Sequence, residues 1–409
     1  GRGSVYETEG ARFIVRVFER FSLTDRDLVS LSLLLADLGA RVVKIERPGS
    51  GDDTRHYLPF KNGESGYFAY LNRNKESLTL DLKSPEGKRI ALELMKKSDV
   101  VIENFSAGTM DRLGLGYEAA KAVKDDIIYA SISGFDQSGP LCHKAAYDII
   151  AQAMGGLLRL TGFPDQPPVK VGVSIADANA GIHMAFCLMA ALYQRDHTGA
   201  GQYIDVSMMD TTMSVLENFV MQYTLNGVVP ERSGNEHSAS APFDMYETKD
   251  DYVAVATGNN TQFSRMQAAM GMDIMSDPRF AENTLRRKNY KELRPILAAW
   301  MKEHTTADIV ALFDRAAVPV APVLGIDELV NHPQIRARGM IETQHHPVLG
   351  DLEMPGFPAK FSTMQTPVRK AAPLLGEDTD AILSGVLGLD EKTIAALKEK
   401  HIVEQHEKG

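Results

Sequence analysis

The sequence predicts an α/β fold: a large domain with a Rossmann-like, doubly wound parallel sheet, and a smaller α+β domain. Three observations support this prediction. Up to about Phe135, short β-branched segments alternate with helix-like segments, and strands separated by helices pair in parallel. The length of 409 residues exceeds that of a usual single domain. Residues 227–243 are rich in Gly, Ser, Pro and Asn, which marks a boundary or a mobile loop.

In the first half of the chain, strand-like and helix-like segments take turns. Residues 13–18 can form an opening strand, and four further segments have the length and β-branched content of strands: 41–46, 77–82, 99–105 and 126–133. A helix is expected from Pro85 to about Ser98. Ser84 supplies its N-cap, Pro85 suits its first turn, and Glu86 complements the helix dipole there.

The second half continues with helices and short strands. We expect helices over residues 147–160 and 177–195, a strand over 203–207, and one long Met-rich helix to about Leu225. The methionines of that helix are expected to fill the core: Met208, Met209, Met213 and Met221. A strand at 251–256 opens the small domain, and 346–361 should form a hairpin turning at Gly350-Asp351. The expected domains are 11–225 for the first part of the large domain, 226–325 for the small domain, and 326–409 for a return segment.

Composition limits the class of protein. The hydrophobic fraction of 44% and charged fraction of 24% are those of an ordinary soluble protein, and polar residues interrupt every long apolar stretch, so no membrane partner is expected. A formal charge of -10 argues against a nucleic-acid partner, because nucleic acids are held by clustered Lys and Arg. Two cysteines cannot form a disulfide framework, which favours a cytoplasmic location.

Common cofactor motifs are missing from the sequence. It contains no phosphate-binding loop, dinucleotide fingerprint, zinc spacing or serine elbow, and its eleven histidines lack metal-ligand spacing. We therefore expect no metal and no permanently bound cofactor. Polar residues do follow the ends of predicted strands, where ligands bind in open α/β sheets: Arg47, Lys83, Asn104 with Phe105, and Arg112 one short helix further on. They could hold a negatively charged, partly aromatic ligand. From the pattern alone, solvated loop charges explain them equally well.

A series of motifs in order resembles family III CoA transferases of the formyl-CoA transferase type. Residues 35–40 read Leu-Ala-Asp-Leu-Gly-Ala, and residues 44–55 read Lys-Ile-Glu-Arg-Pro-Gly-Ser-Gly-Asp-Asp-Thr-Arg. Further matching motifs lie at residues 71–77, 103–105, 110–114, 131–135, 146–148 and 198–202. The resemblance covers roughly residues 31–400. It implies an interlocked homodimer whose substrates are an acyl-CoA and a small carboxylic acid.

The resemblance also implies roles for individual residues. The family's nucleophile falls on Asp177, which would carry an aspartyl anhydride and then an aspartyl-CoA thioester. Taken without the family, Asp177 is an acid at a helix start and would be read as a plain N-cap. The residues expected to contact CoA are Arg47, Leu80, Lys83, Asn104, Phe105 and Arg112, with Tyr147 and Asp148 near the thioester.

Some features depart from the family or leave alternatives open. Residues 13–30 lack the family's Leu-Ala-Gly-Pro turn, so no CoA contact is assigned there. An α-methylacyl-CoA racemase would use a His and Asp pair for proton transfer, but Tyr147 occupies the place of that His. A CoA-binding protein without turnover is the other alternative. Within the transferases, residues 258–263 and the C-terminal part resemble the members that handle dicarboxylates such as succinate or glutarate more than the formate and oxalate enzyme. The sequence does not identify the acids exchanged.

Overall fold

The computed structural model describes residues 14–18 and 26–406, and the chain divides into two compact units. The first unit comprises residues up to 158, residues 170–220 and the segment from 336 onward. The second comprises residues 159–169 and 221–335. The domain limits expected from the sequence stay a prediction.

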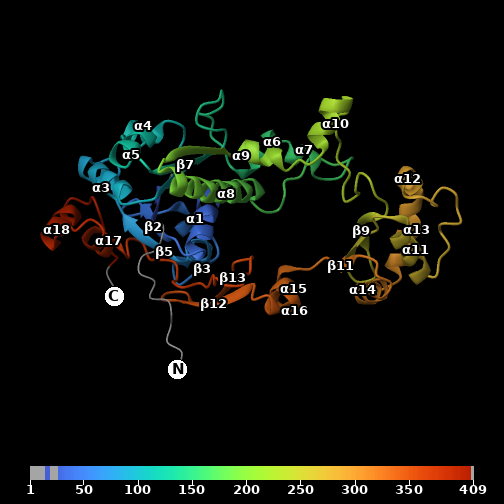
Figure 1. The fold of residues 1–409 in the computed structure, drawn as a ribbon. Coiled ribbons are helices and arrows are strands. Elements are labelled where there is room, and N and C mark those ends of the chain that lie inside the picture. The colour runs from blue at the N-terminus through green and yellow to red at the C-terminus, as the bar shows by residue number, and fades with distance from the viewer. Residues whose placement is uncertain (1–13, 19–25, 407–409) are drawn as a thin grey trace. The chain divides into compact units, whose positions relative to one another are not determined.

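The first unit is built on a parallel sheet of six strands (Figure 1). In sheet order these are β5 (Lys75–Thr79), β2 (Arg41–Glu46), β1 (Ile14–Phe18), β6 (Val100–Glu103), β7 (Ile128–Ser133) and β8 (Gln202–Ser207). Every neighbouring pair is parallel. The strand order reverses between β1 and β6, and ligands of doubly wound folds bind at the carboxyl ends beside that reversal. The expected strands, including the opening one, are therefore confirmed.

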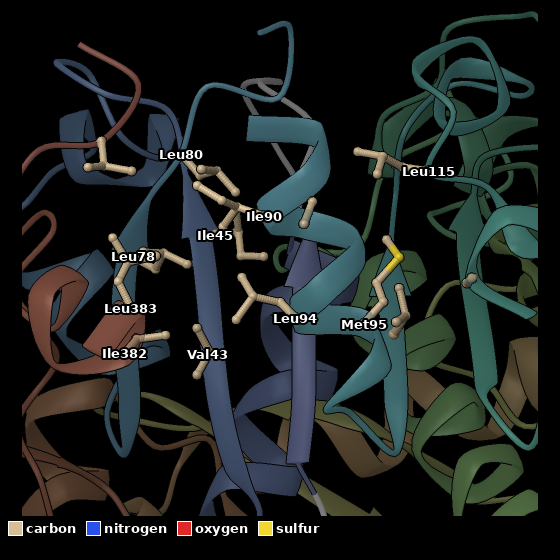
Figure 2. Packing of buried hydrophobic residues seen from close by; sticks show 14 of the residues in the cluster. Val43, Ile45, Leu78, Leu80, Ile90, Leu94, Met95, Leu115, Ile382 and Leu383 are labelled. Carbon is tan, nitrogen blue, oxygen red and sulfur yellow. The ribbon is translucent and has the colours of Figure 1, made fainter. Parts of the chain in front are cut away.

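One face of this sheet is covered by α3 (Pro85–Lys96), α5 (Tyr117–Val123), α17 (Thr379–Gly385) and α18 (Glu391–Glu399). Side chains of successive strand residues point to opposite faces, and Val43 belongs to this core while Val42 belongs to the other one. Figure 2 shows the packing of strand residues Val43, Ile45 and Leu78 against Ile90, Leu94, Ile382 and Leu383. The C-terminal helices thus complete a core that begins near the N-terminus.

The opposite face is covered by α1 (Arg26–Asp37) and α8 (Ile175–Thr198), which pack against each other. Among the residues that the structure describes, α8 is the one helix long and apolar enough to cross a membrane by length and composition. Its inward residues Ala180, Met184 and Leu188 are completely buried against the sheet. A core helix passes the same test, so length and composition alone assign no membrane span here.

The start of α3 follows the sequence prediction. Ser84 caps the helix, its Oγ accepting a 2.9 Å hydrogen bond from the backbone N–H of Gly87, and Pro85 is the first helical residue. Gly87 is required by packing, because a Cβ there would lie 1.9 Å from the carbonyl oxygen of Asp81. The helix therefore begins where the local sequence specifies.

The segment after β8 differs from the prediction. Two helices, α9 (Met208–Ser214) and α10 (Phe219–Asn226), replace the expected single helix. The chain breaks between them where Glu217 adopts a positive φ of 52°. Met208 is buried, but Met213 and Met221 are each 50% exposed. The core interpretation is therefore wrong for these two methionines, because the break removes the continuous helical face on which it depended.

The remaining helices of the first unit are short. They are α2 (Gly66–Leu71), α4 (Thr109–Leu113) and α6 (Asp148–Met154). α7 (Leu157–Leu160) follows α6 after Gly155 and Gly156, and the limit between the two units falls within it. A 3-10 turn, η1 (Asp53–His56), and a two-residue ribbon of β3 (Phe60–Lys61) and β4 (Glu64–Ser65) lie between β2 and α2. The helix expected over 147–160 is thus interrupted where Gly156 takes a φ of 87°.

The return segment contains α16 (Pro333–Ala337) and a hairpin of β12 (Ile341–His346) and β13 (Gly350–Pro355). His346 pairs with Gly350, so the turn is at residues 347–349 and the expected turn at Gly350-Asp351 is wrong. The reason lies in the His346 side chain, whose Nδ1 accepts 3.2 Å hydrogen bonds from the backbone N–H groups of Val348 and Leu349. Sequence pattern gives no sign of this side-chain cap.

The second unit has an antiparallel sheet in the order β11 (Val320–Pro322), β10 (Tyr252–Ala256), β9 (Phe243–Glu247). Its helices are α11 (Asn260–Ala269), α12 (Asn283–Lys288), α13 (Tyr290–Lys302), α14 (Thr306–Arg315) and α15 (Ile326–Asn331). Phe263, Leu297 and Phe313 are completely buried in a core of its own. This unit therefore combines an antiparallel sheet with helices around one core.

Candidate active site

The loop after β2 carries Arg47 at the carboxyl edge of the parallel sheet. Arg47 is exposed, and its Nε donates a 2.6 Å hydrogen bond to Oγ of Ser50. Glu46 holds the loop in place, because its carboxylate accepts a 3.1 Å hydrogen bond from the backbone N–H of Asp52. Gly51 has a φ of +64°, and a Cβ there would lie 2.9 Å from Leu375, so the loop needs glycine at this point.

Glu46 itself is buried and paired with Arg55. Burial alone would raise the pKa of the Glu46 carboxyl, but the charge and hydrogen bonds of Arg55, with the charge of Lys44, outweigh it and lower that pKa. Ser77 adds a hydrogen bond of 2.6 Å to the same carboxylate. The backbone around Arg47 therefore rests on a buried, ionised network.

Two further cations lie exposed at this edge. Lys83 is in the loop between β5 and α3, where its backbone N–H donates a 2.9 Å bond to Oδ1 of Asp81. Arg112 is on α4, and its Nη2 donates a 2.8 Å bond to Oγ1 of Thr109. With Arg47, they give the carboxyl edge three exposed positive groups, a suitable setting for a phosphorylated ligand.

Asn104 and Phe105 form the turn after β6. The backbone N–H of Phe105 donates a 2.7 Å hydrogen bond to Oε2 of Glu103, and this bond fixes the turn. The side chains of Phe105 and Leu80 both belong to the buried core. The side chains at these two positions therefore support the sheet.

Glu103 is a buried acid whose place sequence reasoning did not anticipate, although it stands in the matched motif at 103–105. Burial raises the pKa of the Glu103 carboxyl to about 7, against the hydrogen bonds it accepts from Ser131 and Phe105. It lines a cavity of about 420 Å³ together with Asp111, Tyr129 and Tyr203. Burial of Glu103 could have been predicted from the strand itself. Side chains alternate between the two faces of a strand, so Glu103 lies on the same face as the core residue Val101.

Asp177 lies in the first turn of α8 and is 1% exposed. The N-cap is Ser174, so the plain N-cap interpretation of Asp177 is wrong, because the helix starts two residues before it. The helix dipole favours a negative charge in this turn. Ala176, Ala180 and Gly181 around it are also buried and small, which leaves backbone groups close to the carboxylate.

Asp148, the first residue of α6, contacts the turn that holds Asp177. Its Oδ1 accepts a 2.8 Å hydrogen bond from the backbone N–H of Ala176, and its Oδ2 accepts a 2.6 Å bond from Nε2 of Gln152. Tyr147 is the N-cap of the same helix and is 38% exposed. The structure therefore brings Tyr147, Asp148 and the Asp177 turn together. Sequence reasoning missed Gln152, although it stands four residues after Asp148 on the same helical face.

The Asp177 turn shares one edge of the sheet with Arg47 and Asn104. The helix in a crossover between parallel strands runs opposite to those strands, and α8 ends at the turn that leads into β8. Its first turn must therefore lie at the carboxyl ends of the strands, where Arg47 and Asn104 lie. Phe105 and Leu80 are on one face of the sheet and α8 is on the other.

Within residues 14–18 and 26–406, no group of three or more His, Cys, Asp or Glu side chains is arranged to hold a metal ion. The residues at the edge are three cations, the amides of Asn104 and Gln152, three acids and a tyrosine. This set suits a negatively charged organic ligand and acyl chemistry at a carboxylate.

These features are those of a CoA-transferase, and the chain belongs to CoA-transferase family III, whose model matches residues 29–379. Members of this family transfer CoA between acyl-CoA thioesters and carboxylic acids. The match of the family model confirms the family that the sequence motifs indicate.

Curated relatives cover most of the chain. It is similar to succinyl-CoA:glutarate CoA-transferase of Mus musculus, 38% identical over 91% of this chain and 86% of that protein. It is also similar to acetyl-CoA:oxalate CoA-transferase of Acetobacter aceti, 42% identical over 85% of this chain and 89% of that protein. Among solved structures, a CAIB/BAIF family protein from Brucella suis matches with a TM-score of 0.82 and 34% identity, covering 92% of this chain and 98% of that one.

Proposed function

We propose that this enzyme transfers CoA from an acyl-CoA to a small dicarboxylic acid, with succinyl-CoA as donor, through covalent intermediates on Asp177. The observation that carries the proposal is the place of Asp177, in the first turn of α8 at the carboxyl edge of the sheet. Several relatives support the choice of donor, since their names specify succinyl-CoA with glutarate, citramalate or mesaconate.

The reaction proceeds in balanced steps. An oxygen of the Asp177 carboxylate attacks the thioester carbon and expels CoA thiolate, which leaves an acyl-aspartyl anhydride. The thiolate then attacks the aspartyl carbonyl, which releases the first acid and forms an aspartyl-CoA thioester. The second acid attacks that thioester and the two steps run in reverse. One thioester is consumed and one is formed, so no ATP is needed.

Burial of Asp177 supports this chemistry. Anhydrides and thioesters hydrolyse when water reaches them, and a site that excludes water protects both. The dipole of the 24-residue helix α8 stabilises the carboxylate before attack. Because the side chain is 1% exposed, the thioester reaches it only when neighbouring side chains move aside.

The CoA moiety is assigned to the carboxyl edge. Arg47, Lys83 and Arg112 supply positive charge for its phosphates. The turn at Asn104 and Phe105 and the backbone at Leu80 supply polar groups for the nucleotide. Tyr147, exposed at the start of α6, faces the region of the thioester beside Asp148 in this proposal.

A homodimer is part of the proposal. The outward side of α8 carries an apolar stripe of Ile182, Phe186, Met189 and Tyr193, and Phe186 is 76% exposed. These residues recur at helical spacing, so they form one continuous surface. A second copy of the chain is the partner that we assign to this stripe, as the family resemblance implies.

The decisive experiment traps the acyl group. Incubation with succinyl-CoA, followed by hydroxylamine and mass spectrometry, should label the peptide that contains Asp177. D177A should lose at least about 10³-fold in transfer rate, and D177N should behave alike. D210A is the matched control, since Asp210 is an exposed acid in the first turn of α9. Transfer by D177A at the parental rate would refute the mechanism.

A second experiment identifies the acyl-CoA donor and the acceptor carboxylic acid. The parental enzyme is assayed with succinyl-CoA and acetyl-CoA against glutarate, mesaconate, oxalate and formate. Exchange from succinyl-CoA into longer diacids is the expected result. Exchange restricted to oxalate or formate would remove the proposed substrate class while leaving the Asp177 chemistry intact.

A further inference from the structure

Gln152 connects helix α6 to the segment that leads into Asp177. Its side chain is completely buried, and both ends of its amide are used. Nε2 donates a 2.6 Å hydrogen bond to Oδ2 of Asp148, and Oε1 accepts a 3.0 Å bond from the backbone N–H of Val171. We propose that Gln152 is a positioning residue for acylation of Asp177, an inference that rests on the proposed function.

The hydrogen bonds hold both ends of one short segment. Val171 donates to Gln152, Gln152 donates to Asp148, and Ala176 donates to the other oxygen of Asp148. Residues 171–176 are thus tied to α6 at their first and last residues. Asp177 follows directly, so the place of its turn relative to α6 depends on this chain of bonds.

While position 148 is an aspartate, the chain of bonds requires an amide at position 152. One end must donate to a carboxylate and the other must accept from a backbone N–H, and only an amide does both at this length. Glutamate would keep the acceptor but place an oxygen against Oδ2 of Asp148. Leucine would fill the space but leave that oxygen and the Val171 N–H without these bonds, which is costly in a buried place.

Misplacement of the Asp177 turn should slow the chemical step more than it weakens binding. A shift of about 1 Å in a reacting group can cost about 100-fold in rate. Arg47 and Lys83, at the carboxyl edge after β2 and β5, make none of these bonds. The rate of acylation and the affinity for CoA should therefore respond differently to substitution of Gln152.

The test uses three variants of the full-length chain: Q152E, Q152L and the double variant D148N/Q152E. The double variant exchanges the amide and the carboxylate, so each of the three hydrogen bonds can form again with donor and acceptor reversed between the two side chains. Q194E is the matched control, because Gln194 lies exposed on α8. The readouts are single-turnover acylation of Asp177 by succinyl-CoA, trapped with hydroxylamine, and the dissociation constant for CoA.

We expect Q152E and Q152L to acylate about 100-fold more slowly, with less than about a threefold change in CoA affinity, while Q194E matches the parent. D148N/Q152E should regain at least about tenfold over Q152E, because the bonds reform. Parental acylation rates in folded Q152L would overturn the inference, as would a double variant no faster than Q152E. If Q152E fails to fold, the acylation rates of Q152L and the double variant still test whether Gln152 positions Asp177.

Labelling of Asp177 in the parental enzyme distinguishes a failure of the positioning role of Gln152 from a failure of the proposed function. If the parent transfers CoA without labelling Asp177, the proposed mechanism fails and the role of Gln152 with it. If the parent labels Asp177 and the Gln152 variants label it equally fast, only the positioning role is wrong.

Discussion

Arg55 holds the carboxylate of Glu46 through two hydrogen bonds of 2.8 Å each, from Nε and Nη2. The guanidinium also lies 3.7 Å from the ring centroid of Phe68. Arg55 is on η1 and Glu46 ends β2, so this buried pair fixes the loop between them that carries Arg47. One ion pair therefore connects the stability of the sheet to the shape of the proposed CoA edge.

Removal of Arg55 should destabilise the fold. R55L leaves Glu46 buried without its main partner, and we expect the free energy of unfolding to fall by about 3–5 kcal/mol. Urea unfolding followed by circular dichroism measures this. R336A is the control, because it breaks an exposed ion pair with Glu353 and should leave the urea concentration at the unfolding midpoint unchanged. Equal midpoints for R55L and the parent would contradict the role assigned to the pair.

Glu103 should make stability fall as pH rises. Its folded pKa is raised from 4.5 to about 7, so between these values the native state binds more protons than the unfolded state and loses stability with increasing pH. The full effect above pH 7 is about 3 kcal/mol. E103Q keeps a neutral group at all pH values, so its unfolding free energy should lack this slope between pH 5 and pH 8.

The control for that experiment is E86Q, because Glu86 is on the surface of α3 beside Lys400. It should retain the parental slope between pH 5 and pH 8. An identical slope in E103Q and the parent would show that Glu103 is ionised throughout this range.

Lys83 should contribute to CoA affinity and little to the chemical step. K83A removes one exposed positive charge from the carboxyl edge, and we expect KM for the acyl-CoA to rise about tenfold with kcat unchanged. The difference between variant and parent should shrink at high salt, because the contact is ionic. K88A, which removes a charge further along α3, serves as the control. A fall in kcat at unchanged KM would place Lys83 near the chemistry instead.

Phe186 should be needed for the proposed dimer. F186D puts a charge in the middle of the α8 stripe, and light scattering should then report the mass of one chain. L58D is the control, since Leu58 is 77% exposed elsewhere in the first unit. A parental mass for F186D would exclude this stripe as the contact between copies.

Local sequence determined much of the fold. The cap at Ser84, the strand at residues 41–46 and the helix containing Asp177 depend on groups close together in the chain, so periodicity and capping rules are enough to predict them. The break after α9 and the turn at 347–349 were mispredicted because the backbone conformation of Glu217 and the two hydrogen bonds accepted by His346 override the periodic pattern.

Some features of the candidate site could likewise be predicted from the sequence, and others depended on the tertiary structure. The ordered motifs were sufficient to indicate the family and to select Asp177 as the candidate nucleophile, because they are linear features of the chain. Only the tertiary structure decided that Ala176 donates to Asp148, that Val171 donates to Gln152, and that Glu103 is buried beside Ser131. Such contacts join segments far apart in the sequence, and hydrogen bonding and desolvation depend on which groups the whole fold brings within a few ångströms of each other.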